Sequence, residues 1–165
     1  MRMLFTCLGV AGAVAALGTN ADAATATANM SISFTISAQC TVVSASTMAF
    51  PNTGLLNANV DQTSTITVLC TNTTPYNISL DKGLFGASVS ARLMQGTGGS
   101  PDTVSYSLFR DSGRTQNWGQ TIGTDTVAGT GTGSNVATTV YGRIAPQVSK
   151  KPDSYTDTIT VTVTY

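Results

Sequence analysis

The sequence predicts an all-β fold, a sandwich of two packed sheets. Its 165 residues include no Glu and only three Lys, so strong helix formers are scarce, while Thr, Ser, Val and Gly are plentiful. After residue 23, short segments in which apolar and polar residues alternate are separated by frequent turn signals, and no stretch has a helical period. About seven such strands in one domain describe an immunoglobulin-like β-sandwich.

The first residues have the pattern of a signal peptide rather than of a folded element. Met1 and Arg2 form a short cationic start, and an almost continuous apolar run follows over residues 3–17. Ala21-Asp22-Ala23 then has the small-x-small pattern that signal peptidase cleaves. A membrane anchor is the weaker alternative, because the run is shorter than the roughly 20 residues that a membrane span needs. We therefore expect residues 1–23 to be a cleaved signal peptide and the protein to be exported.

Residues 24–40 form an unusually long alternation. Every even position from Ala24 to Cys40 is apolar, and every odd position is Thr, Asn, Ser or Gln. Because successive side chains of a strand point to opposite faces, this pattern predicts extended backbone with one apolar face. Strands in globular domains usually have about 5 to 6 residues, so one domain has no evident use for the whole stretch. It is either a frayed tail leading into an ordinary first strand, or a surplus strand that pairs outside its own domain.

The remaining strands follow from the same alternation, broken by turn residues such as those at 50–54. We expect them at residues 63–69, 76–80, 104–110, 114–118, 136–144 and 154–165, with the Gly/Thr-rich residues 123–135 as a flexible connection holding at most short strand pieces. In the last of these strands, apolar residues such as Ile159, Val161 and Val163 alternate with polar ones to the end of the sequence. We expect no neighbouring edge strand to follow it.

Two cysteines remain after removal of the signal peptide, Cys40 and Cys70. An even pair in an exported protein favours a disulfide, which would close a loop of about 30 residues and stabilise the fold by about 3 to 4 kcal/mol. A metal site would lack ligands, because the sequence has no His and no CxxC spacing. We expect a Cys40–Cys70 disulfide, no metal and no cofactor.

The charged residues argue against catalysis and against nucleic acid as a partner. They make up 10% of the chain with a net charge of zero, and all eight acids are Asp. Without His or Glu, the common acyl-transfer triads and paired-glutamate glycosidase sites are excluded. We expect Asp111 and Arg114 to form a surface ion pair at a hairpin turn, and Trp118 to pack in the core. The sequence therefore predicts no catalytic site, and no membrane insertion after signal cleavage.

Two motifs carry a resemblance to a known family. The first runs from Tyr106-Ser107-Leu108-Phe109-Arg110-Asp111 through Gly113-Arg114-Thr115 to Trp118-Gly119, and the second is Tyr141-Gly142-Arg143-Ile144 followed by residues 155–165. From about residue 32 onward, and most specifically near its C-terminus, the chain resembles the spore coat protein U domain family, also seen in archaic (Csu-type) chaperone–usher pilins. The pair Cys40 and Cys70 lies where the disulfide of this family is expected.

The resemblance implies an incomplete immunoglobulin-like domain and a route of assembly. Subunits of this family are exported to the periplasm, capped by a periplasmic chaperone and passed to an outer-membrane usher. The N-terminal extension of one subunit then completes the sheet of the next, a reaction called donor-strand exchange. The implied product is a pilus at the bacterial cell surface that serves adhesion and biofilm formation, built from identical or related subunits.

The resemblance also implies an organisation of the chain: residues 1–23 are the signal peptide, residues 24–34 a donor-strand extension and residues 35–165 the spore coat protein U or pilin domain. The donor face is then made of Ala26, Ala28, Met30, Ile32 and Phe34. The acceptor strand, which a chaperone would also face, presents Ile159, Val161, Val163 and Tyr165. Two other interpretations stay open, a secreted adhesin or lectin-like domain that folds alone and a spore or cell-surface coat component.

Overall fold

The structure is a computed structural model that describes residues 22–165. The predicted signal peptide, residues 1–23, lies almost entirely outside the described residues. The chain divides into two units, Met1–Thr35 and Ile36–Tyr165. Within the described range, no helix is long and apolar enough to cross a membrane.

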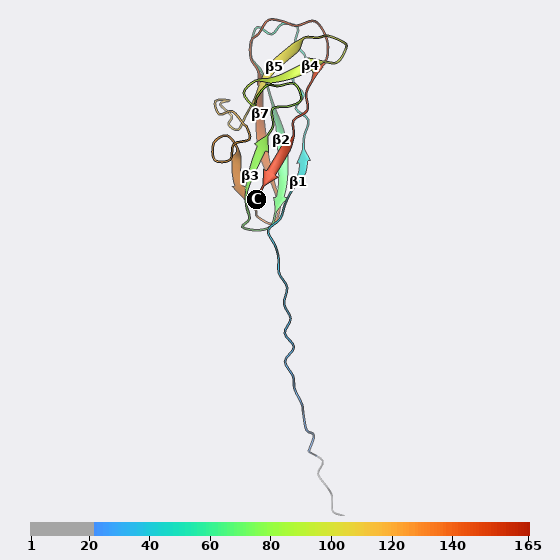
Figure 1. Cartoon of the computed structure of the whole chain (residues 1–165), viewed down its shortest axis with the longest axis vertical. Coiled ribbons are helices and arrows are strands. Elements are labelled where there is room, and N and C mark those ends of the chain that lie inside the picture. Colours follow the sequence, from blue (N-terminus) through green and yellow to red (C-terminus); the bar gives the residue numbers. More distant parts are fainter. Residues whose placement is uncertain (1–21) are drawn as a thin grey trace, which may run out of the picture. The chain divides into compact units, whose positions relative to one another are not determined.

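The larger sheet of the second unit has six strands in the order β1-β2-β7-β5-β4-β8 (Figure 1). They are β1 (Cys40–Ala45), β2 (Val60–Cys70), β7 (Asn135–Ile144), β5 (Thr103–Phe109), β4 (Arg92–Gly96) and β8 (Tyr155–Thr156). All neighbours in this sheet are antiparallel. The longest ladder, between β2 and β7, runs in continuous register from Val60 opposite Ile144 to Leu69 opposite Asn135.

The smaller sheet has three antiparallel strands in the order β6-β3-β9. They are β6 (Val127–Thr130), β3 (Pro75–Leu80) and β9 (Val161–Thr164). The inward side chains of β2, β3, β5 and β7 form one buried cluster between the two sheets, to which Ile66, Ile78 and Leu108 belong. The fold is therefore a two-layer sandwich whose core lies between the sheets, as the alternation predicted.

Four of the predicted strands are present with small shifts of their ends, as β2, β3, β5 and β7. The predicted strand at residues 114–118 is wrong, because only an isolated bridge between Phe109 and Asn117 forms there. β4 (Arg92–Gly96) was not predicted, since its sequence RLMQG does not alternate. The predicted strand at residues 154–165 is divided into β8 and β9, which pair with different sheets.

Two local predictions are confirmed. Cys40 and Cys70 form a disulfide and lie opposite each other in the β1–β2 ladder, with their Cα atoms 4.1 Å apart. Trp118 is fully buried, and its indole Nε1–H donates to the main-chain carbonyl of Ile78 at 2.9 Å. The disulfide therefore ties the edge strand β1 to the neighbouring strand β2 at one end of the sandwich.

Candidate strand-binding groove

β1 and β9 are edge strands of different sheets. Among residues 22–165, β1 pairs only with β2, and β9 pairs only with β3. An edge strand exposes main-chain N–H and C=O groups that no neighbouring strand satisfies. At the disulfide end the two edges lie against each other. A bulge between Val42 and Ser44 then interrupts the β1 ladder, and past it a groove opens between the two sheets.

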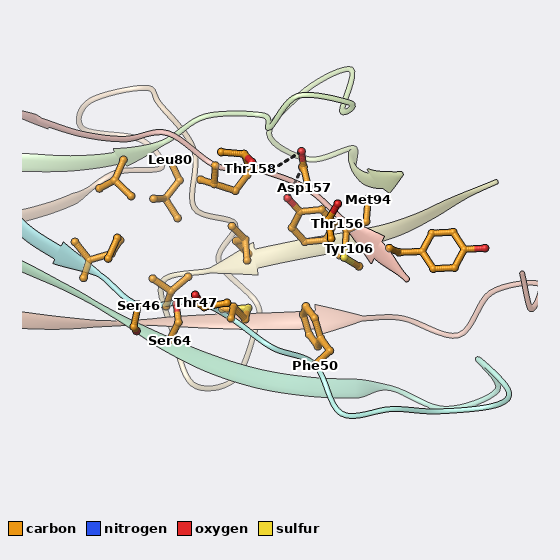
Figure 2. A pocket seen from close by; sticks show the side chains of 18 residues that line it. Ser46, Thr47, Phe50, Ser64, Leu80, Met94, Tyr106, Thr156, Asp157 and Thr158 are labelled. Carbon is orange, nitrogen blue, oxygen red and sulfur yellow. Dashed lines mark hydrogen bonds between the residues drawn. The ribbon is translucent and has the colours of Figure 1, made fainter. Parts of the chain in front are cut away.

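The groove has a volume of about 440 Å³ and lies between residues 45–50 on one side and residues 155–161 on the other (Figure 2). Its floor is formed by apolar side chains from both sheets, namely Ile66, Leu80, Met94, Leu108 and Val140. A second hollow of about 510 Å³ continues it, because Met48, Phe50 and Tyr155 line both. Together the walls extend over residues 45–54 and 150–161.

The walls of the groove are more polar than its floor. Ser46 and Thr47 follow one wall, and Asp157 and Thr158 follow the opposite one (Figure 2). No strand of the described residues lies between the edges of β1 and β9. An extended segment with one apolar face fits such a groove, because its main chain can pair with an edge while its apolar side chains contact the floor.

The carboxylate of Asp81 holds the β9 side of the groove. Residues 157–160 connect β8 with β9, where the chain passes from one sheet to the other. Asp81 accepts hydrogen bonds from the main-chain N–H of Thr160 at 2.9 Å and of Gly83 at 3.0 Å. Its own N–H donates to the carbonyl of Thr160 at 3.1 Å. Burial acts to raise the pKa of Asp81, but the hydrogen bonds and the nearby Arg92 outweigh it and hold this pKa below its ordinary value.

Asp157 holds the same wall from the other side. It accepts a hydrogen bond from the Tyr106 hydroxyl at 2.6 Å and one from the main-chain N–H of Leu84 at 2.9 Å. Burial and the hydrogen bond to Asp157 raise the pKa of Tyr106 far above its ordinary value. The hydroxyl therefore stays protonated and remains a donor. These contacts fix residues 157–160 without a continuous β-ladder.

Arg92, at the start of β4, is fully buried beside Asp81. Its guanidinium donates to four main-chain carbonyls, those of Asp81, Val89 and Trp118 at 2.8 Å and that of Leu80 at 3.1 Å. Burial lowers the pKa of Arg92, while the nearby Tyr106, Asp81 and Asp157 oppose this change. The groove-lining residue Leu80 is the last residue of β3. The Arg92 side chain thus joins this end of β3 to the loop that follows it and to the chain at Trp118.

The residues predicted for the acceptor strand separate into two groups. Ile159 and Val161 line the groove. Val163 lies opposite Ile78 in the β3–β9 ladder and packs on the core, and Tyr165 is exposed. Neither of the latter two lines the groove, so their part in contacting a chaperone stays a prediction.

The residues predicted for the donor face belong to the first unit. Residues 22–39 have no strand partner within the described chain. The side chains of Met30, Ile32 and Phe34 are between 81 and 88% exposed, and Ala26 and Ala28 are exposed as well. Such exposure of three large apolar side chains in sequence is unfavourable in water, which makes the segment a candidate for pairing with a partner.

Met48 and Phe50 line the groove but were not predicted to do so. They follow β1 at a spacing of two residues, and this short alternation is the signal that could have identified them. Gly142 of β7 makes room for them, because a Cβ atom at this position would collide with the sulfur of Met48. The turn residues at 51–54 indicate a loop, but they do not indicate that the loop forms one wall of a groove.

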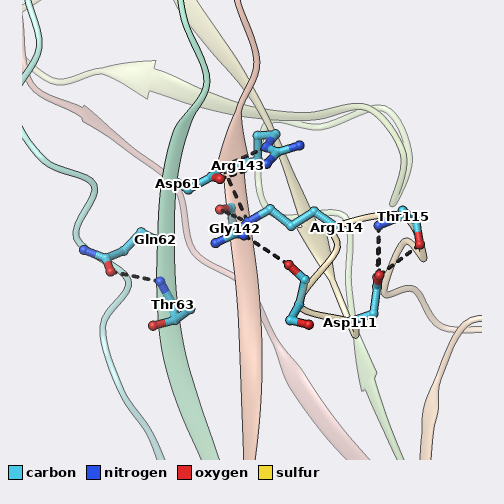
Figure 3. Close-up of polar contacts among 9 residues, drawn as sticks. Asp61, Gln62, Thr63, Asp111, Arg114, Thr115, Gly142 and Arg143 are labelled. Atoms are coloured by element: carbon cyan, nitrogen blue, oxygen red, sulfur yellow. Dashed lines mark hydrogen bonds and ion pairs between the residues drawn. The ribbon is translucent and has the colours of Figure 1, made fainter.

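The predicted ion pair between Asp111 and Arg114 is wrong. Arg114 has a left-handed backbone conformation, with φ at 55°, and its Nε lies 3.4 Å from Asp61 on β2 (Figure 3). Asp111 instead accepts hydrogen bonds from the main-chain N–H groups of Thr115 and Gln116, at 3.0 and 2.7 Å. The Asp111 carboxylate closes the turn, as is usual for Asp in such positions. Arg114 pairs instead with Asp61, which is distant in sequence.

Asp61 is the centre of a small charged cluster on the exposed face of β2 and β7. It accepts hydrogen bonds from Nε and an Nη atom of Arg143, at 2.7 and 2.8 Å, and these lower its pKa below the ordinary value. The guanidinium of Arg114 also lies over the ring of Tyr141, 5.7 Å from its centre. Within residues 22–165, no three side chains of the types that ligate metals gather in one place. The cluster is a surface ion-pair network.

Residues 26–162 match the Spore Coat Protein U domain family. The chain belongs to this family. The chain is 30% identical to Protein U of Myxococcus xanthus over 159 residues, and the alignment covers 88% of each protein. Its resemblance to the spore coat protein U domain family, predicted from the two motifs, is thereby confirmed.

A solved structure shares the fold of this Spore Coat Protein U domain. It is a chain of the CsuC–CsuE chaperone–tip adhesion subunit pre-assembly complex from the archaic chaperone–usher Csu pili of Acinetobacter baumannii. The TM-score is 0.52 at 20% sequence identity, and the match covers 79% of this chain but only 40% of that one. The predicted fold class, an incomplete immunoglobulin-like β-sandwich without its final strand, is confirmed.

Proposed function

We propose that this Spore Coat Protein U domain protein is a structural subunit of a surface pilus or fimbria, assembled by the chaperone–usher route through donor-strand exchange and serving adhesion and biofilm formation. One observation carries the proposal. The same chain has an apolar groove beside two sheet edges and an exposed segment with one apolar face. Each of these features is unfavourable in water, and each satisfies the other when the segment of one copy enters the groove of the next.

The lengths of the segment and of the groove support this pairing. The donor face from Ala26 to Phe34 has nine residues, which span about 30 Å at about 3.3 Å per residue. The first wall of the groove, residues 45–54, has a similar number of residues, ten, of which the last four lie in a loop. Five alternate side chains of the segment can contact the floor.

Burial of the apolar face provides the main driving force. Met30, Ile32 and Phe34 would each contribute about 1.5 to 3 kcal/mol on leaving water, and Ala26 and Ala28 contribute less. Main-chain hydrogen bonds to the sheet edges add to this and give direction. A shift of one residue would place Ser31 and Ser33 on the apolar floor, so the alternation also fixes the register.

The proposal assigns a task to each part of the chain. Residues 1–23 direct export, residues 24–34 form the donor strand and residues 35–165 form the acceptor domain. Before a second subunit arrives, the unfilled groove is an aggregation hazard. A periplasmic chaperone would cover it, contacting Ile159 and Val161 and, past them, Val163 and Tyr165, and an outer-membrane usher would receive the complex. No catalytic residue or cofactor takes part.

A second candidate is a component of a spore coat or cell-surface coat. The description of the matching family and the similarity to Protein U favour it. It uses the same fold and the same groove but joins a different assembly. A search for chaperone and usher genes beside the gene for this protein separates the two candidates, because only the pilus needs both.

Expression of the full chain in a bacterial periplasm tests the proposal. With its chaperone, the wild type is expected to give ladders that resist detergent but dissociate on heating. A variant without residues 24–34 is expected to bind chaperone and to give no ladder. Ile32→Asp and Ser33→Asp are matched controls, because they add the same charge to opposite faces of one strand. Ile32→Asp should abolish the ladder and Ser33→Asp should keep it. A stable, soluble monomer of the full wild-type chain without any partner contradicts the proposal.

A further inference from the structure

The groove is closed at one end and open at the other, and this decides how an inserted strand must run. At the disulfide end β1 lies against β9. At the other end the walls continue past Phe50 and Tyr155 to residues 51–54 and 150–154. These belong to two loops, residues 51–56 between β1 and β2 and residues 145–154 between β7 and β8. These loops lie at the end of the sandwich away from the C-terminus (Figure 1), and we call them the tip. In donor-strand exchange as proposed above, the inserted segment stays joined to its own subunit through residue 35. Its carboxyl end must therefore leave at the tip, with Ala26 near the closed end.

The connection between the inserted segment and its own domain is short. Cys40 is held by the disulfide. Gln39 is held as well, because its N–H donates to the Thr71 hydroxyl at 3.1 Å and its carbonyl accepts from the N–H of Thr71 at 2.9 Å. Only residues 35–38 remain as a tether, and four extended residues span at most about 14 Å. The disulfide end of the donor subunit must therefore lie next to the tip of the acceptor.

Both surfaces that meet in this way carry exposed apolar side chains. On the tip, Leu55 is 64% and Val148 is 82% exposed. Their segments lie side by side, because the N–H of Gln147 donates to the carbonyl of Leu56 at 2.9 Å and the N–H of Leu56 donates to the Ser149 hydroxyl at 3.2 Å. On the tether, Ile36 is 73% exposed. It is the first apolar residue after the inserted segment and so leaves the groove at the tip.

We propose that Ile36 of the donor subunit packs against Leu55 and Val148 of the acceptor, a second contact between two copies of this chain outside the groove. The proposal rests on donor-strand exchange as the function, and it commits to a second copy as the occupant of the tip. The contact is continuous with the groove, and the four-residue tether holds its two sides together. This contact would fix the angle between successive subunits. With the inserted strand alone, each subunit could rotate about the tether.

Photo-cross-linking of polymers of the full chain tests this contact. Ile36 is replaced by the photo-cross-linker p-benzoylphenylalanine, and the polymer is grown from a mixture of isotope-labelled and unlabelled subunits. The expected product joins position 36 of one copy to a peptide of another copy that contains Leu55 or Val148. The same cross-linker at Ser37 points to the other face of the extended tether and is the matched control. It should give this product at least several-fold less often.

The outcomes separate the contact from the function on which it rests. Val148→Asp should lower the yield of the cross-link at position 36 several-fold and leave the detergent-resistant ladder unchanged. If ladders form and position 36 cross-links elsewhere, or to no second copy, the tip contact is contradicted while donor-strand exchange stands. If the wild-type chain with its chaperone forms no ladder, donor-strand exchange itself is contradicted, and the tip contact with it.

Discussion

The two ends of the sandwich use the same pair of edge strands in opposite ways. At the disulfide end, β1 and β9 lie against each other and Cys40 is bonded to Cys70, so the chain closes its own core. At the other end the edges are separated by a groove whose floor is apolar. The first half is complete in one subunit, whereas the second half keeps the shape of a sandwich without the strand that would complete it.

This difference shows how a domain can hold an unfilled groove open. The closed half relies on a covalent bond and on ordinary strand pairing. The open half relies on polar groups at its inner surface, because the guanidinium of Arg92 and the carboxylates of Asp81 and Asp157 replace main-chain pairing along residues 81–92 and 157–160. Hydrogen bonds are directional, so they can hold the main chain of the groove wall in place although no neighbouring strand packs against it.

The largest effect on stability is expected from the open half. Arg92→Ala leaves a cavity and removes the donor from four main-chain carbonyls, two of them buried. It should lower the free energy of unfolding by about 3 to 5 kcal/mol. Chemical denaturation of the variant and of the wild type, each in complex with the chaperone, measures this change. Arg143→Ala removes an exposed guanidinium as a control and should cost less than about 1 kcal/mol. Equal effects of the two variants would show that the buried cation does not support the groove.

A slightly smaller effect is expected from the closed half. Replacing both Cys40 and Cys70 by Ser removes the constraint on a loop of about 30 residues and should lower the free energy of unfolding by about 3 to 4 kcal/mol. Hydrogen exchange should become faster in β1 and at the adjoining end of β2. Amides held by Asp157 and Asp81 should keep their relative protection. Preferential loss of protection around the groove would contradict the division into two halves.

The smallest effect is expected on acidification. The pKa of Asp81 is lower in the folded than in the unfolded chain, so its stabilising contribution is complete above the unfolded pKa and is lost as the pH falls through the folded one. The free energy of unfolding should therefore decrease below about pH 4. Asp81→Asn should make this decrease shallower, while Asp61 still contributes to it. Superimposable pH profiles of Asp81→Asn and the wild type would rule out this role of Asp81.

The parts of the fold that were predictable are those with a local signal. β2, β3, β5 and β7 alternate because one face of each is buried, and Cys40 and Cys70 are an even pair after the signal peptide. β4 was missed because it lacks this alternation. The strand expected at residues 114–118 did not form, because Asp111 binds the main-chain N–H groups of Thr115 and Gln116 that a ladder would need.

The groove could be predicted only in part, because its existence depends on which strands become edges. Ile159 and Val161 were expected and line it, since an alternating terminal strand faces a core or a partner. Met48 and Phe50 lie close together in the sequence, but Met94 is more than forty residues away, and only the topology brings the two segments to one groove. The contacts of Arg92 and of Arg114 are equally non-local, so no short stretch of sequence could show that one is buried among carbonyls and the other pairs with Asp61.

Mixing two assembly-defective subunits tests the central claim most directly, namely that the donor segment of one copy fills the groove of another. Ile32→Asp places a charge on the apolar donor face and leaves the groove intact. Ser64→Phe fills part of the groove, which Ser64 lines, and leaves the donor face intact. Each variant alone, released from its chaperone, should give no polymer, and the mixture should give a one-to-one dimer that withstands detergent and stops at two subunits. A mixture without dimers, under conditions in which the wild type forms ladders, would contradict the account, as would polymers of either variant alone.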